Sequence, residues 1–418
     1  MKVKTFFKAL VFVIVLVDCM AFGFFWRDIG NHQGPSTAAL ERLLGSKVLS
    51  ANLPSDELFN RNYQRILSDY VKPVKPLDLK YAGIAGMVAS LGDPHTMFMP
   101  PQEAEEFNDE TKANFGGVGA RLTQDALGAG VFSSFEDGPA YAAGLRKGNV
   151  ITAVNGANIA GKELDAVVDM IKGKPGTVVH LTVVQAGKEK PVMISIKRAL
   201  ITAPTVDGNV IPGTNIGYMS ILQFSEPTTG QFDKEISALE AKNIKGLVID
   251  LRGNPGGLLE TATDMLSRFV EDKVVVTMKF RDGKVETDRT NSGELHEFNY
   301  PIAILIDQDS ASAAEIFSGC LHDYGKVTLV GTHSYGKASV QNVFPLVDRA
   351  SAKITIARYF LPGGEYIGRE VDEDGVMTKG GLEPDVKVEL NTDKQVTFGD
   401  PVSDNQLAKA VDLLKSKI

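Results

Sequence analysis

The spacing of hydrophobic and polar positions changes three times along this chain. Between Ala38 and about Phe107, apolar residues recur at the three- and four-residue spacing of amphipathic helices. From 115 to 196, short alternating runs typical of strands are separated by glycine turns, with one amphipathic helical stretch at 164–172. Apolar runs then alternate with helical stretches from 214 to 389. The pattern predicts a multi-domain protein of the α/β class.

Two uninterrupted apolar runs in the last region have the length of buried parallel strands. They are Gly246–Leu251 and Pro301–Ile306, and each is followed by a loop rich in small residues. In α/β sheets the active site lies at the carboxyl ends of the strands. We therefore expect the functional residues in the loops that follow these two runs. Helices are predicted at 258–269 and 403–417.

The N-terminal segment, residues 1–27, is typical of an export signal. Lys2, Lys4 and Lys8 precede an apolar run over 9–17. The lysine bias predicts that the body of the protein is extracytoplasmic, on the periplasmic or extracellular face. The segment is interpreted as an uncleaved membrane anchor, a cleaved signal peptide, or a lipid anchor at Cys19; a buried helix of the fold is the remaining alternative.

Composition excludes several classes of protein. The chain has 418 residues and a net charge of −8, and its basic residues are scattered, so nothing favours nucleic acid as a partner. The two cysteines, Cys19 and Cys320, support no disulfide framework. The six histidines lack metal-ligand spacing. We expect no metal and no organic cofactor.

The candidate chemistry lies in the C-terminal third. Ser312 follows small residues directly before a helical stretch, and Lys337 stands in a glycine-preceded turn 25 residues later. A buried, neutral lysine can act as the base that a serine nucleophile needs, provided that its pKa falls several units from about 10.4. Ser310 and Ser318 are local competitors for Ser312. The alternative is that all three serines only cap or solvate the start of the helix.

Residues 108–200 resemble a PDZ domain in its bacterial arrangement. The signature is Pro139–Leu145 followed by Ile151–Gly156. Such domains bind a free C-terminus as an added strand and hold its carboxylate in backbone N–H groups. The resemblance implies that this carboxylate loop consists of Phe115, Gly116, Gly117, Val118 and Gly119. It also implies a pocket for the last apolar side chain of the ligand near Val118 and the helix at 164–171.

Three motifs in this order resemble the carboxyl-terminal processing peptidases, also called tail-specific proteases. They are Asp250–Gly257, Ser310–Glu315 and Gly336–Gln341. The resemblance implies a serine–lysine protease core with an inserted PDZ domain and helical N- and C-terminal segments. The expected domain boundaries are 1–27 for the signal or anchor, 28–107 for the helical region, 108–200 for the PDZ domain, 201–395 for the core and 396–418 for the last helix.

The same resemblance assigns the site residues. Ser312 corresponds to the nucleophile, Lys337 to the general base and Gln341 to the residue that orients the lysine. The backbone N–H of Ala313, together with that of Gly256 or Gly257, corresponds to the oxyanion hole. Glu315 corresponds to a glutamate with a structural role. The implied partners are protein C-termini, with a homodimer and an adaptor protein as further candidates.

Two alternatives remain open from the sequence. His322 and His333 are candidates for a histidine-based triad, but the chain lacks the Gly-x-Ser-x-Gly motif of the esterases that use one. Asp250 resembles a triad acid, although its position predicts that it ends a strand and pairs with Arg252. The alternative of another functional class is a catalytically silent PDZ scaffold, against which the intact serine, lysine and glutamine argue.

Overall fold

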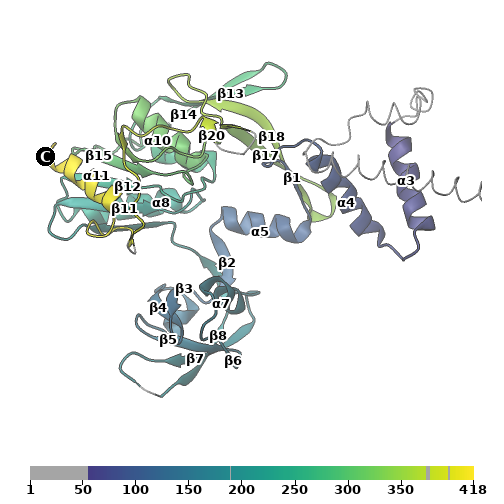
Figure 1. Cartoon of the computed structure of the whole chain (residues 1–418), viewed down its shortest axis with the longest axis horizontal. Helices are drawn as coiled ribbons and strands as arrows, with labels where there is room; N and C mark the ends of the chain where they lie inside the picture. The colour runs from purple at the N-terminus through teal and green to yellow at the C-terminus, as the bar shows by residue number, and fades with distance from the viewer. Residues whose placement is uncertain (1–54, 189, 373–376, 394–395) are drawn as a thin grey trace, which may run out of the picture. The chain divides into compact units, whose positions relative to one another are not determined.

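The computed structural model describes residues 55–418, apart from 189, 373–376 and 394–395 (Figure 1). The chain divides into two compact units, Met1–Phe98 and Met99–Ile418. The predicted signal or anchor segment, 1–27, lies outside the described residues, and so does Cys19. Among the described residues, no helix has both the length and the apolar character that crossing a bilayer requires.

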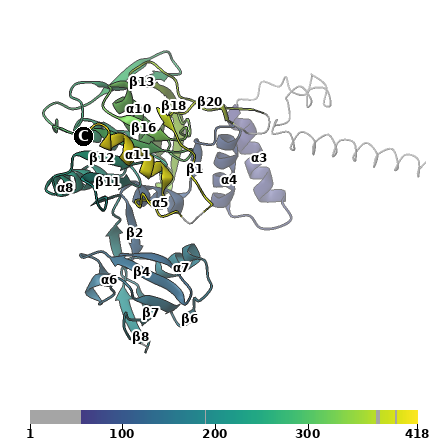
Figure 2. The ribbon, with the colours of Figure 1, turned by 60° about the vertical axis from the view of Figure 1, so that its left-hand side comes forward.

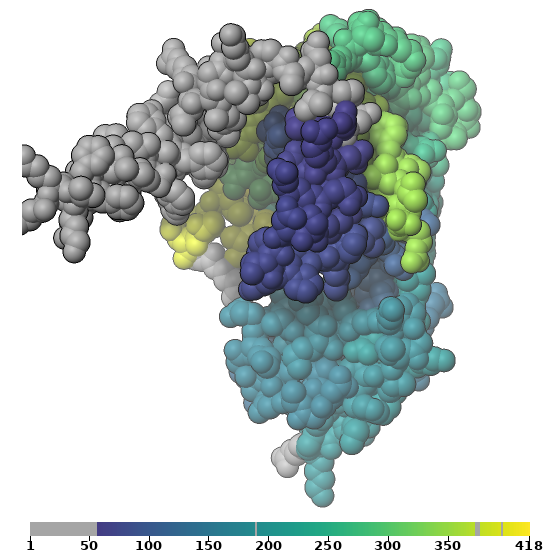
Figure 3. Space-filling model, turned by 90° about the vertical axis from the view of Figure 1, so that its right-hand side faces the viewer, coloured from purple at the N-terminus to yellow at the C-terminus, as the bar shows by residue number. Residues whose placement is uncertain are grey.

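The described part of the first unit contains a pair of helices, α3 (Ser55–Asp69) and α4 (Pro76–Ala89). Pro76 begins α4, where its missing N–H costs no helical hydrogen bond. The Tyr63 hydroxyl donates to the Pro76 carbonyl at 2.9 Å and joins the two helices. The described part of this unit is purple in Figure 3. Its exposed apolar side chains include Val71 and Met87. Strand β1 (Met97–Met99) follows at the unit boundary.

The second unit begins with helix α5 (Pro101–Thr111), which leads to a small β domain with its own core. The sheet of this domain is antiparallel, with the strand order β3-β4-β5-β7-β8 and β6 beside β5. Its elements are β3 (Ala120–Asp125), β4 (Gly128–Ser134), α6 (Pro139–Ala142), β5 (Val150–Val154), β6 (Ala157–Asn158), α7 (Leu164–Ile171), β7 (Val178–Val184) and β8 (Val192–Lys197). Fully buried Ile151, Val167 and Leu181 hold α7 against the sheet.

The sequence predicts a glycine turn at 115–119, but most of this segment is a strand. Strand β2 (Asn114–Gly117) pairs antiparallel with β9 (Ala199–Thr202), so the chain enters and leaves the β domain through one strand pair. Glycine is required at 116, because a Cβ there would lie 2.3 Å from the Gly173 carbonyl oxygen. Only Val118 and Gly119 of this segment lie outside a strand. The φ of Gly119 is +76°, a value that favours glycine.

The core domain is built on a six-stranded sheet with the order β10-β11-β12-β15-β16-β21. Its strands are β10 (Val206–Val210), β11 (Ile216–Ile221), β12 (Gly246–Asp250), β15 (Ile302–Ile306), β16 (Thr328–Gly331) and β21 (Val386–Lys387). Strand β10 is antiparallel to β11, and all the other pairs are parallel. Every residue of β12 and β15 is buried, which confirms the two predicted central strands.

Helices cover both faces of this sheet (Figures 1 and 2). On one face, Leu247 and Ile249 of β12 share a core with α8 (Thr228–Glu240), α9 (Leu259–Leu266) and α10 (Ala313–Asp323). On the other face, Val248 packs with α11 (Asn405–Lys415). The α/β fold class is therefore confirmed. Helices α9 and α11 are shorter than predicted; α11 begins late because Asp404 caps it.

A second sheet joins β17 (Ser339–Pro345), β18 (Ser351–Phe360), β13 (Val274–Phe280) and β14 (Val285–Arg289), in that order. The turn of the long β17–β18 hairpin contains a short 3-10 helix at Val347–Arg349. A further hairpin is formed by β19 (Glu370–Val371) and β20 (Met377–Lys379).

The order of the parallel strands gathers the predicted motifs. Neighbouring strands β12, β15 and β16 end at Asp250, Ile306 and Gly331. The loops that follow carry 252–257, 307–312 and 332–337, in that order. Since parallel strands end at one edge of a sheet, three segments far apart in the sequence meet there.

Candidate active site

The three candidate serines differ in burial and in the partners of their hydroxyls. Ser310 and Ser318 are fully buried, and their hydroxyls donate to the carbonyls of Leu251 and Ala314 at 2.8 and 2.6 Å. Ser312, directly before α10, is only half-buried. Of the three, Ser312 is therefore the least buried. It also forms a capping box with Glu315 at the start of α10, so the capping role that the sequence left open is present as well.

The backbone at Ser312 adopts a conformation that L-residues rarely take. Its φ is 56° and its ψ is −117°. Such a conformation costs about 1–3 kcal/mol and persists only where the surroundings fix it. Here the Ser312 N–H donates to the Glu315 carboxylate at 2.8 Å. The carboxylate therefore holds the serine at the sharp bend between the loop after β15 and the start of α10.

The same carboxylate holds the segment that carries the predicted base. The N–H groups of Gly336 and Lys337 donate to Glu315 at 2.6 and 2.9 Å, and the Ser334 hydroxyl donates at 2.5 Å. One oxygen, Oε2, accepts from both Ser312 and Lys337. The structure thus brings the two predicted catalytic segments onto one carboxyl group.

A second pair of contacts fixes the lysine segment from the other side. The Tyr335 N–H donates to the Ser310 carbonyl at 3.0 Å, and the fully buried Tyr359 hydroxyl donates to the Lys337 carbonyl at 2.5 Å. The Lys337 side chain itself is half-buried. Its backbone is therefore attached both to the serine loop and to β18.

Glu315 is fully buried, and its charge state matters for this arrangement. Burial raises the pKa of Glu315, and the hydrogen bonds from Ser334, Gly336, Lys337 and Ser312 oppose that rise. Four donors point at its two oxygens, and the ionised form is the one that accepts from all of them. The expected structural role of Glu315 is thus a link between two loops.

Gln341 lies on β17, opposite Thr355 of β18. Its amide nitrogen donates to the hydroxyls of Ser339 and Thr355 at 2.8 and 3.2 Å. These bonds fix which way the amide points. Gln341 also lines a cavity of about 630 Å³ between β17 and the start of α9, together with Leu259 and Glu260.

Gly256 of the loop at 252–257 lies against the serine, and Gly257 lies against the backbone of Phe224. A Cβ on Gly256 would lie 2.7 Å from Ser312 Cβ and 2.8 Å from the Ala313 nitrogen. The Gly256 N–H is occupied, since it donates to the Asn254 side chain at 2.8 Å. Within the described part of the chain, the N–H groups of Gly257 and Ala313 have no acceptor. The loop and the start of α10 thus each contribute one N–H group without an acceptor among the described residues.

Asn254 is a site residue that the sequence analysis missed. Its side chain is fully buried; the amide nitrogen donates to the Ile221 carbonyl at 2.7 Å, and its oxygen accepts from Gly256. Its own carbonyl accepts from the Ala311 N–H at 2.9 Å. The asparagine before Pro255 was the available signal, because such residues fix turns through their side chains.

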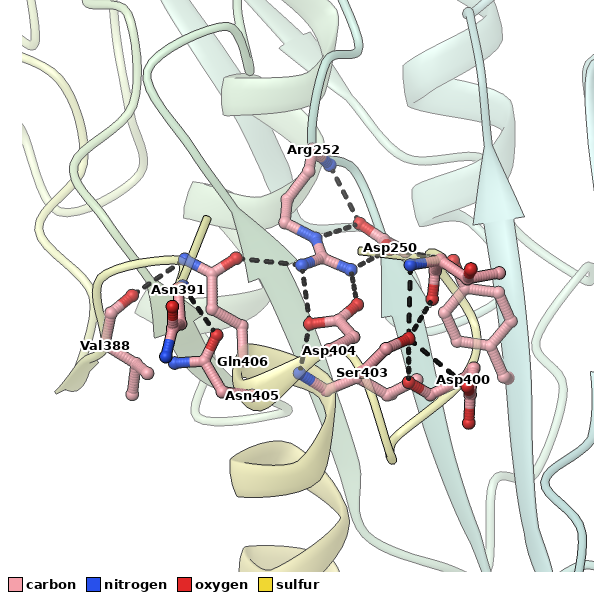
Figure 4. Close-up of polar contacts among 12 residues, drawn as sticks. Asp250, Arg252, Val388, Asn391, Asp400, Ser403, Asp404, Asn405 and Gln406 are labelled. Atoms are coloured by element: carbon pink, nitrogen blue, oxygen red, sulfur yellow. Dashed lines mark hydrogen bonds and ion pairs between the residues drawn. The ribbon is translucent and has the colours of Figure 1, made fainter. Parts of the chain in front are cut away.

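Asp250 and Arg252 form the ion pair that the sequence predicts. The Arg252 side chain is 1% exposed and meets Asp250 at 2.6 Å. Asp250 also accepts from the buried Tyr218 hydroxyl at 2.8 Å. Arg252 contacts Asp404 at 2.6 Å as well, a partner that the sequence did not reveal (Figure 4). Asp250 therefore already has two side-chain partners directly before the loop at 252–257.

Both histidines that the sequence offers as alternative bases have other partners in the structure. His322 lies near the end of α10 and pairs with Asp385 at 3.0 Å, whereas Ser312 precedes the first residue of that helix. Ten residues of helix separate them by roughly 15 Å. The His333 ring bonds the neighbouring Ser334 carbonyl at 3.1 Å. His322 thus lies too far from Ser312 to act as its base, and one ring nitrogen of His333 is occupied by the neighbouring backbone carbonyl.

The β domain has an unpaired strand edge among the described residues, which is what strand addition requires. Strand β3 is an edge strand, because β4 is its one neighbour in the sheet. Helix α7 lies beside β3. Val118 is buried in the same core as Val167 of α7. The predicted tail-binding residues thus lead directly into a free strand edge that is bordered by a helix.

The described residues contain no cluster of metal-binding side chains. No group of three or more His, Cys, Asp or Glu side chains there is arranged to hold a metal ion. Cys320 is a buried free thiol whose sulfur lies 3.0 Å from the Val275 carbonyl oxygen.

Family models match both globular parts of the chain. The model of peptidase family S41 matches residues 215–388, and a PDZ domain model matches residues 135–185. The first range contains the three loops at the sheet edge, and the second lies within the β domain.

Curated relatives are similar over most of the chain. The carboxy-terminal processing protease CtpA of Bacillus subtilis (strain 168) is 32% identical over 349 residues, which is 83% of this chain and 72% of the relative. A carboxy-terminal-processing protease of Bartonella bacilliformis is 34% identical over 336 residues, or 79% of this chain and 74% of the relative. CtpB of B. subtilis is 35% identical over 320 residues, with 66% of the relative covered.

Solved structures share the fold. A Bacteroides fragilis structure described as an S41 protease aligns with 84% of this chain and 92% of its own, with a TM-score of 0.53 and 17% sequence identity. At that identity, the likeness concerns the fold alone.

We expect Glu315→Gln to destabilise the protein by about 2 kcal/mol, because an amide offers one acceptor oxygen and turns an NH₂ group toward buried donors. Activity on a peptide substrate should fall as well, since the serine and lysine segments lose their common acceptor. Chemical denaturation and kcat measure the two effects. Glu365→Gln, at an exposed glutamate, is the matched control. Unchanged stability in Glu315→Gln would contradict the linking role.

Proposed function

This chain belongs to the carboxy-terminal processing proteases, a family of serine proteases within peptidase family S41, and from that premise we propose that it cleaves protein chains with a Ser312–Lys337 dyad. Its substrates are proteins bound by their free C-termini in the PDZ domain. One observation carries the proposal: a single buried carboxylate, Glu315, binds the backbone of both Ser312 and Lys337.

In the proposed reaction, the Ser312 hydroxyl attacks the carbonyl carbon of the peptide bond, and neutral Lys337 accepts its proton. The lysine then gives that proton to the leaving amine, so that an acyl-enzyme on Ser312 remains. Water, activated by the same lysine, hydrolyses the ester. Gln341 orients the lysine as a neutral amide, which leaves the charge of the base unaltered.

The oxyanion hole of this proposal consists of the N–H groups of Ala313 and Gly257. Sequence alone leaves Gly256 and Gly257 equivalent. Gly256 already donates to Asn254, whereas the N–H of Gly257 has no acceptor among the described residues. Gly256 serves by its size instead, since any side chain there would collide with Ser312. Preorganised N–H donors of this kind are among the largest contributions to such catalysis.

The C-terminal tail of the substrate binds as an added strand along β3, beside α7. Its carboxylate lies at Val118 and Gly119, the part of the predicted Phe115–Gly119 segment that is not paired with β9, and its last side chain enters the pocket near Val118. The free strand edge and the buried apolar residues of α7 support this assignment. The lysine-flanked apolar N-terminus supports an extracytoplasmic location for the reaction, with the N-terminal segment as signal or anchor.

Ser312→Ala should abolish proteolysis, because only the attacking hydroxyl is lost, while folding and tail binding persist. Ser318→Ala, in which a buried hydroxyl is removed, is the matched control and should keep activity. Cleavage of an unstructured protein and labelling by a fluorophosphonate probe measure the outcome. Continued cutting by Ser312→Ala would reject the nucleophile. Absence of labelling in the native protein would favour the silent PDZ scaffold.

Lys337→Arg keeps the positive charge but cannot lose a proton near neutral pH, so it should be as inactive as Lys337→Ala. In the native enzyme, kcat/KM should rise with pH as the lysine becomes neutral. A pH profile run beside both variants tests this. Substantial turnover by Lys337→Arg would rule out a neutral lysine base.

Amidation of the substrate's C-terminus should weaken its binding to the PDZ domain about tenfold or more, because the N–H groups of the carboxylate segment lose a charged partner. Fluorescence anisotropy with Ser312→Ala and matched free and amidated peptides measures the affinities without cleavage. Equal affinity for the two peptides would argue against recognition of the tail by this domain.

A further inference from the structure

The C-terminal helix reaches the active-site loop through one arginine. Arg252, the first residue of the 252–257 loop, is held between Asp250 of the preceding strand and the first residues of α11 (Figure 4). Its Nη1 donates to Asp404 at 3.1 Å and to Gln406 at 2.8 Å. Its Nη2 donates to Asp250 and to Asp404, each at 2.6 Å. With Nε bonded to Asp250 at 2.9 Å, all five N–H donors of the guanidinium are used.

The partners of Arg252 are themselves fixed. Asp404 is fully buried and also accepts from the Leu407 N–H at 3.0 Å, so that one carboxylate caps α11 and holds the arginine. The Gln406 amide nitrogen donates to the Val388 carbonyl at 2.7 Å. The ring of Phe398 covers the guanidinium at 4.4 Å. The arginine therefore cannot shift without moving the start of the helix.

Two carboxylates face one guanidinium at this position. Burial alone would lower the pKa of Arg252, but its hydrogen bonds to Asp250 and Asp404 raise it overall, so the arginine stays charged. The docking of α11 does not need these polar contacts, because Leu407, Val411 and Leu414 already pack the helix against the sheet. The polar contacts fix the position of the loop, whereas the apolar contacts fix the helix.

The loop is short and is held at both ends. At its start, Arg252 contacts Asp404, and Gly253 donates to Asp307 at 3.0 Å. In its middle, Asn254 bonds the Ile221 carbonyl and the Ala311 N–H. Its far end is Gly257, whose N–H is the proposed oxyanion donor, and on either side of it Phe224 donates to the Gly256 carbonyl at 2.9 Å and accepts from the Leu258 N–H at 2.7 Å. Because so few residues lie between the two ends, displacement of the start would alter the position of a donor whose catalytic value depends on a fraction of an ångström.

We propose that Asp404 and Gln406, at the start of the C-terminal helix, are positioning residues that hold the oxyanion loop in register through Arg252. The proposal rests on the proposed function, because it needs Gly257 in the oxyanion hole. It assigns a role in transition-state stabilisation to a helix more than 60 residues beyond the base in the sequence.

The test uses Asp404→Asn in the full chain. Asparagine caps a helix as well as aspartate does, so this variant weakens the grip on Arg252 while it keeps the cap. We expect kcat on a short peptide to fall about tenfold or more with KM unchanged. Inhibition by a peptide aldehyde, whose adduct with Ser312 needs the oxyanion hole, should weaken by the same factor. Asp404→Glu should restore part of kcat.

Leu414→Ala is the matched control. It removes an apolar contact of the same helix and lowers the melting temperature, but it leaves the arginine cluster intact, so kcat well below the melting temperature should stay native. A loss of kcat in Leu414→Ala equal to that in Asp404→Asn would overturn the proposal, and so would an effect of Asp404→Asn on KM alone. If Asp404→Asn does not fold, Gln406→Ala takes its place. We then expect a smaller fall in kcat. A native kcat in Gln406→Ala would contradict the proposal.

Failure of this proposal is distinguishable from failure of the proposed function. Native turnover that Ser312→Ala abolishes establishes the function first. Full activity of Asp404→Asn and Gln406→Ala against that background would then reject the positioning role alone.

Discussion

The arrangement of the active site depends on the buried carboxylate of Glu315. It accepts hydrogen bonds from the serine loop and from the lysine turn, two segments that follow different strands of the sheet. Without this acceptor, three backbone N–H groups and a hydroxyl would be buried unpaired, and the unusual backbone at Ser312 would lose its support. The same group that stabilises the fold locally therefore sets the relation between the proposed nucleophile and the proposed base.

The parallel sheet provides the frame on which that carboxylate acts. Strands β12, β15 and β16 are neighbours, so the loops after them meet at one edge whatever their separation in the sequence. Two of the loops are joined by Glu315. The third, which contains three glycines, is held by the Asn254 side chain, which bonds Ile221, and by the Arg252 side chain, which contacts Asp404. Buried polar residues thus fix the backbone of the segments that carry the proposed catalytic residues.

Recognition and cleavage are assigned to separate parts of the chain. The β domain has its own hydrophobic core, and the chain enters and leaves it through the paired strands β2 and β9. Its free strand edge suits an extended peptide of almost any sequence, because strand addition uses backbone groups. Specificity for a tail is therefore expected to lie in the carboxylate segment and in the pocket beside α7, and the chemistry in the core.

The sequence by itself determined the fold class, because the period of the apolar residues reports directly on helices and buried strands. It also indicated Ser312 and Lys337, since small residues and glycine occur where a backbone must bend or approach closely. Only the tertiary structure shows that the Gly256 N–H donates to Asn254, the difference on which the proposed choice of Gly257 rests. It likewise revealed Asp404 as a partner of Arg252, 152 residues away. Such pairs leave no periodic signal, and their contact depends on how the sheet and helices pack.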